Sequence, residues 1–147
     1  MQTTQQYPMK LTVLTPTRRI LESVGCSSVH FSSSQGVLGI LPEHADLVCA
    51  LGTGLVYYET NDTTAFLTIS GGVAKVDGST VTLLADVAED AASIDVGRAQ
   101  RALERARERL TTGVGSNGTP EEVHEAVAAQ ARALARIEAA TLHSTGR

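Results

Sequence analysis

The period of the hydrophobic pattern changes near residue 92, and this change constrains the fold more than any other feature of the chain. Before it, short apolar runs alternate with turn residues such as Asn61-Asp62 and Asp77-Gly78, which is typical of strands joined by tight turns. After it, apolar residues recur every three or four positions, which is typical of amphipathic helices. The sequence therefore predicts an all-β module followed by a helical module.

The second module contains two helical segments separated by a glycine-rich connector at residues 113–118. Ser93 is the expected N-cap of the first helix. Thr119-Pro120-Glu121-Glu122 predicts the start of the second, because threonine can cap it, proline suits the first helical position and Glu122 completes a capping box. The apolar positions are mostly alanine, which buries little surface, so we expect marginal docking of the kind a conformational switch requires. A helix pair that stays in place fits the same pattern.

Two glycine-containing runs interrupt the β module. The run from Gly36 to Ala45 combines two glycines, a proline and a histidine with apolar residues, and it predicts a hairpin with a bulge that ends near Pro42. Ser70-Gly71-Gly72 is interpreted as a bend between two strands, since a single Gly-Gly pair is a weak signal for a phosphate loop.

Charge and composition exclude several classes of protein. Residues before Ser93 carry four basic and nine acidic side chains, whereas eight arginines and seven acids follow, so the two modules are expected to have different partners. An acidic first module and 3% aromatic residues argue against a nucleic-acid-binding barrel. No run approaches the roughly 18 apolar residues of a membrane span. Residues 1–8 lack the features of a signal peptide and are expected to form a disordered polar leader.

No catalytic constellation is visible in the sequence. The four histidines have neither metal-ligand spacing nor a paired carboxylate motif, and there is no Walker-type run. Cys26 and Cys49 are too few for a disulfide framework and are expected to be buried, reduced thiols. We therefore expect a protein that is not an enzyme by itself and requires no metal or cofactor.

Several motifs taken together resemble the ε subunit of F-type ATP synthases, the equivalent of the mitochondrial δ subunit. They are G-V-L-G-I-L-P-E-H-A at residues 36–45, I-S-G-G-V-A-K-V at 69–76, V-T-L-L-A-D at 81–86 and the helical hairpin. The resemblance covers nearly the whole chain from Met9. It implies a ten-stranded β-sandwich at residues 9–88 and an antiparallel α-helical hairpin at residues 89–147.

The resemblance also implies a role for each module. The sandwich would bind the γ subunit and the ring of membrane c subunits, and the hairpin would inhibit ATP hydrolysis by inserting between γ and the catalytic α/β hexamer. The chain would then be a non-catalytic rotor subunit of the central stalk that couples γ to the c ring during proton-driven ATP synthesis. It would lie peripheral to the membrane, on the cytoplasmic face of the bacterial inner membrane or the stromal side of a plastid thylakoid.

Two sets of interface residues follow from the resemblance. The rotor interface would comprise Ser34, Gln35, Val37, Leu38, Pro42 and His44. Val37 stands where many relatives have an acidic residue, so the contact is expected to depend less on salt than theirs. Lys75 replaces the family's usual glutamate after the double glycine. An inhibitory latch to acidic segments of the β subunits would comprise Arg98, Arg101, Arg105, Arg107 and Arg109. These arginines equally fit an ordinary solvated helix face.

The run from Ile94 to Ala99 matches the I/L-D-x-x-R-A motif through which some bacterial ε subunits bind ATP. The nucleotide ligands implied by the resemblance are Glu89, Asp95, Arg98, Ala99, Arg105, Arg132 and Arg136. From the residues alone, Asp95 and Arg98 also fit a simple surface ion pair. ATP would be a regulatory ligand, and the alternative function is a free-standing ATP-binding sensor.

Overall fold

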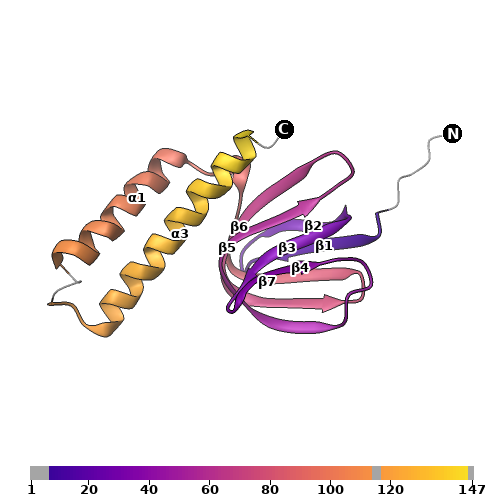
Figure 1. Ribbon diagram of the computed structural model, residues 1–147, viewed down its shortest axis with the longest axis horizontal. Helices are drawn as coiled ribbons and strands as arrows, with labels where there is room; N and C mark the ends of the chain where they lie inside the picture. The colour runs from indigo at the N-terminus through magenta and orange to yellow at the C-terminus, as the bar shows by residue number, and fades with distance from the viewer. Residues whose placement is uncertain (1–6, 114–116, 146–147) are drawn as a thin grey trace.

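The chain forms a β-sandwich followed by two helices in the computed structural model, which describes residues 7–113 and 117–145 (Figure 1). The strands are β1 (Met9–Leu14), β2 (Arg19–Cys26), β3 (Ser28–Ser33), β4 (Gly36–Ile40), β5 (Leu47–Glu59), β6 (Thr64–Asp77) and β7 (Thr80–Asp90). They are followed by a 3-10 turn η1 (Ala91–Ser93), helix α1 (Val96–Glu108), a π-helical turn η2 (Arg109–Gly113) and helix α3 (Pro120–Thr145). Most of the expected polar leader, residues 1–6, lies outside the described residues.

The strands form one sheet in the order β2-β1-β7-β6-β5-β3-β4, in which β1 and β7 are parallel and the other neighbours antiparallel. The sheet folds over into two layers, as Figure 1 shows. Alternate residues of each strand point between the layers, so Leu11, Phe31, Val56 and Leu83 are fully buried in one core. Burial of these side chains, each contributing about 1.5–3 kcal/mol, holds the layers together.

In residues 7–113 and 117–145 the sheet has seven strands, where ten were expected, and three of the seven are long. β5, β6 and β7 contain 13, 14 and 11 residues. β6 runs through Gly71 and Gly72, whose φ angles of +73° and +116° bend the strand. Pairing with β7 continues on both sides of the bend, at Ser70↔Val87 and Gly72↔Ala85. The glycines therefore bend one strand, where the sequence predicted two.

The run from Gly36 to Ala45 forms β4 and the turn after it, and the predicted bulge is wrong. β3 and β4 pair residue for residue from Val29↔Ile40 to Ser33↔Gly36. Gly39 allows the His30 ring to lie close to the backbone of β4, because a Cβ at this position would lie 2.9 Å from the ring. The irregularity lies on the other side of β3, between Phe31 and Ser33 where this strand pairs with β5.

Capping residues mark the start of both helices, and one of the two expected caps is corrected. Asp95 caps α1 by accepting a hydrogen bond from the backbone N–H of Arg98 at 3.1 Å. Ser93, the expected cap, instead ends η1 and donates its hydroxyl to the Asp90 carbonyl at 2.8 Å. The capping box is confirmed, since Thr119 and Glu122 exchange side-chain-to-backbone hydrogen bonds of 3.1 and 3.2 Å.

Helix α3 lies between α1 and the sandwich (Figure 1). It packs on β5 and β6, where Ala139 and Ala140 meet Leu55 and Phe66. The buried residues of the two helices are all alanine, as predicted: Ala99, Ala106, Ala126, Ala133, Ala135 and Ala139. Each methyl buries little area, so the seams between the helices and against the sheet have little shape to fix them.

Candidate functional site

The junction between the sandwich and α3 gathers part of the predicted nucleotide site. Glu89 of β7 and Arg136 of α3 face each other, with Arg136 Nε 3.0 Å from Glu89 Oε1 and Nη2 donating to Oε2 at 3.4 Å. Both side chains are largely buried, with exposed fractions of 21% for Arg136 and 29% for Glu89. Arg132 lies one turn before Arg136, and its Nη2 donates to Glu125 Oε1 at 2.8 Å within the same helix.

A small cavity lies beside this ion pair. It is lined by Thr68, Ile69, Ser70, Val87, Glu89, Arg132, Ala135 and Arg136. Its volume of about 30 Å³ accommodates about one water molecule, so the docked arrangement has no room for a nucleotide. Thr68 is nearly fully buried, and Ser70 shares a 2.9 Å hydrogen bond with Thr53. The sheet face that meets the two arginines therefore contains both hydroxyl and apolar side chains.

The other predicted nucleotide ligands lie elsewhere. Asp95, Arg98, Ala99 and Arg105 do not line this cavity. The Asp95 carboxylate caps α1 instead of forming an ion pair with Arg98, and Ala99 is buried in the helical module. The structure thus brings Glu89, Arg132 and Arg136 together and places the rest of the set on the neighbouring helix.

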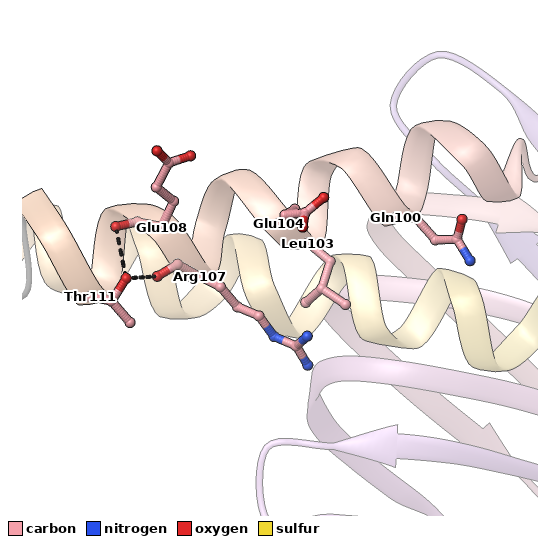
Figure 2. A pocket seen from close by; sticks show the side chains of 6 residues that line it. All are labelled: Gln100, Leu103, Glu104, Arg107, Glu108 and Thr111. Atoms are coloured by element: carbon pink, nitrogen blue, oxygen red, sulfur yellow. Dashed lines mark hydrogen bonds between the residues drawn. The ribbon is translucent and has the colours of Figure 1, made fainter.

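The predicted latch follows helix α1 and ends at Arg109, the first residue of η2. All five arginines of the set are exposed, and in residues 7–113 and 117–145 none of them forms an ion pair. Figure 2 shows an open groove along this helix, lined by Gln100, Leu103, Glu104, Arg107, Glu108 and Thr111. The Thr111 hydroxyl donates to the carbonyls of Arg107 and Glu108 at 3.0 and 3.3 Å. The groove therefore mixes charges of both signs around one apolar side chain.

The predicted rotor interface lies at the free edge formed by β4 and its flanking turns. Val37 is 67% exposed. Leu41, which was not among the residues expected at this interface, is 61% exposed. Ser34, Gln35 and Pro42 are also exposed, whereas Leu38 and His44 are half-buried. The His44 Nδ1 lies 2.7 Å from the Ala45 carbonyl oxygen. These side chains form a surface without charge except at Glu43.

An apolar row that the sequence did not indicate crosses the outside of the sandwich. Cross-strand pairing places Leu14 beside Leu84, Leu84 beside Val73 and Val73 beside Ala50. Leu84 and Val73 are 50% and 44% exposed, and Val48 at the margin of the row is 69% exposed. No local signal could have found this row, because its members come from four strands and meet only through their register.

The two cysteines are free thiols in different surroundings. Cys26 is fully buried, and burial raises its pKa to about 11, so little thiolate exists at neutral pH. Cys49 is half-buried, and burial also raises its pKa. Burial raises the pKa of Tyr58 as well, with smaller contributions from Asp90 and Cys26.

The described residues contain no cluster of His, Cys, Asp and Glu that could hold a metal ion.

Comparison with known proteins identifies the family. Residues 8–91 match the family described as "ATP synthase, Delta/Epsilon chain, beta-sandwich domain", and residues 93–141 match its "long alpha-helix domain". The chain belongs to the ATP synthase delta/epsilon family. The resemblance drawn from the motifs is thereby confirmed. The gap between the two matched ranges falls within η1, beside the Glu89–Arg136 pair.

Relatives within the delta/epsilon family come from bacteria and chloroplasts. The ATP synthase epsilon chain of Carboxydothermus hydrogenoformans is 44% identical over 69% of this chain and 75% of its own length. The epsilon chain of Desulforamulus reducens is 39% identical over 89% and 96%, respectively. The chloroplastic epsilon chain of Marchantia polymorpha is 32% identical over 92% and 98%.

Solved structures share the delta/epsilon fold. One chain of the mitochondrial ATP synthase of Euglena gracilis, in an OSCP/F1/c-ring assembly, has a TM-score of 0.75 at 22% identity and covers 95% of this chain and 86% of its own. A chain from the central stalk and c ring of the Tetrahymena thermophila enzyme has a TM-score of 0.60 at 15% identity, covering 93% of this chain and 99% of its own.

In the described part of the chain, no helix is both long and apolar enough to cross a membrane.

Proposed function

We propose that this chain is a non-catalytic rotor subunit of an F-type ATP synthase that couples γ to the c ring, and that its hairpin restrains ATP hydrolysis. The observation that carries the proposal is the match of both domains, in order, over nearly the full length of epsilon chains such as that of Desulforamulus reducens. The solved chains of similar fold come from F1/c-ring and central-stalk assemblies. The subunit would lie at the membrane through the complex, on the cytoplasmic face in a bacterium or the stromal side in a plastid.

The sandwich offers two surfaces suited to the rotor partners. The apolar row of Leu14, Leu84, Val73 and Ala50 is a continuous face on which γ can dock by burying apolar area. The edge at residues 34–44 would meet the c ring, and its exposed Val37 gives that contact an apolar centre. Because the two surfaces consist largely of uncharged side chains, high salt should weaken them little.

The hairpin exposes the five arginines of the predicted latch. The arginines of α1 are exposed while α3 covers the sheet, so they remain available to acidic segments of the catalytic hexamer. Such a contact would be electrostatic and would weaken as the salt concentration rises. The alanine seams allow the hairpin to leave the sandwich without losing much buried area.

Removing the hairpin tests the inhibitory role. Truncation after Ala92 should raise ATP hydrolysis by the assembled synthase several-fold while γ and the c ring remain bound, since the sandwich surfaces are intact. Hydrolysis is measured with a coupled ATPase assay, and assembly is measured from the subunits retained on affinity purification. Unchanged hydrolysis in a fully assembled enzyme would contradict the inhibitory role and leave the rotor role standing.

A second candidate function is ATP sensing, which the convergence of Glu89, Arg132 and Arg136 favours. ATP would be a regulatory ligand and would enter only after the docked helix moves, because the cavity holds about one water molecule. Calorimetric titration of the full chain with ATP, beside an Arg98→Ala variant, tests this function. Absence of heat at millimolar ATP would contradict it.

A further inference from the structure

One lysine lies on the same outer face of the sandwich as the apolar row. Lys75 of β6 points outward, since the residues before and after it are buried in the core. Strand register places it beside Val48 of β5 and Thr82 of β7. Val73, a member of the row, lies two residues before it on the same face of β6. The row and the Lys75 ammonium therefore belong to one surface.

Lys75 forms no ion pair with the part of the chain that the structure describes. None of the ion pairs in residues 7–113 and 117–145 includes it. Two carboxylates line the same open hollow as Lys75, those of Asp46 and Asp77. The Asp46 carboxylate accepts the backbone N–H of Gly78 at 3.1 Å, and Asp77 lies on the side of Lys75 away from the row. In the free chain, water therefore solvates the exposed ammonium.

A protein that covers the apolar row also covers Lys75. Residues two apart on a strand lie about 7 Å from each other, because a strand rises about 3.3 Å per residue. That spacing is small beside a protein interface, which buries about 800 Å² on each partner. Val48 is 69% exposed and lies directly across from Lys75, so apolar surface borders the lysine on two sides. Docking on the row therefore removes water from the ammonium.

The loss of water specifies what the docking protein has to present. A buried ammonium without a partner opposes docking, whereas a hydrogen-bonded carboxylate offsets its desolvation. Asp86 lies two residues after Leu84 on β7, across the row from Lys75, and would repel a carboxylate placed there. The charges on this face therefore favour an acidic group on the Lys75 side of the row.

From this placement we infer that Lys75 is a recognition residue for the γ subunit and pairs with a carboxylate side chain of γ beside the docked row. The inference rests on the proposed docking of γ on the row and adds the charged contact that orients it. Apolar contact supplies the buried area, and the ion pair selects the γ surface that fits, because a basic surface would be repelled. The interface covers the pair, so salt screens it little.

Binding of full-length variants to immobilised γ of the same synthase tests the recognition residue. Lys75→Glu should weaken binding at least ten-fold, because two carboxylates would then face each other in the interface. Lys75→Arg keeps the positive charge and should bind nearly as well as the parent chain. Lys10→Glu is the matched control, since it makes the same charge change at an exposed position of β1, level with Thr80 and outside the row. It should weaken binding less than two-fold.

Crosslinking with a carbodiimide, which joins a lysine amine to a carboxylate in contact with it, tests the pairing in the parent chain. Lys10 and Lys75 are the only lysines of the sequence. Mass spectrometry of the crosslinked complex should find Lys75 joined to an aspartate or glutamate of γ, and Lys10 joined to none. Lys75→Arg should abolish this product while γ stays bound. Replacing the crosslinked γ acid by lysine should restore binding of Lys75→Glu.

These measurements separate the recognition residue from the docking of γ itself. If Leu84→Glu loses γ while Lys75→Glu binds like Lys10→Glu and Lys75 yields no γ product, γ docks on the row and the recognition residue is overturned. If the parent chain does not bind γ, or Leu84→Glu binds like the parent, the proposed docking fails and the inference fails with it. Circular dichroism checks the fold of each variant, and the crosslink in the parent chain does not depend on any variant folding.

Discussion

Gly72 lies where β6 bends from one layer of the sandwich to the other. Residues with a side chain rarely adopt its φ of +116°. A Cβ at this position would also lie 2.0 Å from the Leu84 carbonyl oxygen. Backbone closeness, and not only backbone conformation, therefore requires glycine at this position. The same bend leaves the neighbouring Val73 and Leu84 on the outside of the sandwich, where they form part of the apolar row.

Gly72→Ala should destabilise the chain by at least about 2 kcal/mol, because a steric clash with β7 is added to the backbone strain. Gly36→Ala is the matched control, since Gly36 has a similar φ of +130° but nothing within 4 Å of an added Cβ. Urea unfolding followed by circular dichroism measures both. Equal losses in the two variants would mean that β7 moves aside and that the close approach is not required.

At the scale of elements, the starts of the helices were predictable because caps act over three or four residues. Thr119 and Glu122 bond each other's backbone, as their spacing predicted. The start of α1 was less accurately predicted, because η1 precedes it and gives Ser93 a different partner. Asp95 then has to satisfy the free N–H groups of α1, which uses the carboxylate that the motif assigned to a ligand.

Thr119→Ala should lower the stability of the first turn of α3 by about 1 kcal/mol, since the helix loses a side-chain acceptor. Amide hydrogen exchange at Glu121, Glu122 and Val123 should accelerate roughly five-fold, because about 1.4 kcal/mol corresponds to ten-fold. Thr119→Ser keeps the hydroxyl and should exchange like the parent chain. Unchanged exchange in the alanine variant would show that the capping box does not stabilise this end.

At the scale of the whole molecule, the two modules present opposite kinds of surface. The sandwich exposes the apolar row and an uncharged edge, and the hairpin exposes arginines on the helix far from the sheet. This division suits a subunit held permanently by apolar contacts at one end and engaged reversibly by charge at the other. It also explains why the net charge of the whole chain, −4, says little about either partner.

Leu84→Glu should weaken binding to the γ subunit by at least ten-fold, because a charge would be buried at the centre of the apolar row. The folded chain should tolerate it, since Leu84 is 50% exposed. Val127→Glu on α3, at 49% exposure, is the matched control and should bind γ normally. Binding is measured by surface plasmon resonance on immobilised γ. Equal binding by both variants would place the γ contact elsewhere on the sandwich.

The sequence by itself determined the two modules, the alanine seams, the capping box and the family, because each depends on residues close in the chain or on the hydrophobic period. Tertiary structure decided that β6 bends at Gly71 and Gly72 without ending and that α3, rather than α1, covers the sheet. It also decided that Glu89 meets Arg136, 47 residues away. The reason is physical: strand register and helix docking depend on packing between distant segments, and no local pattern records which distant partner a side chain will meet.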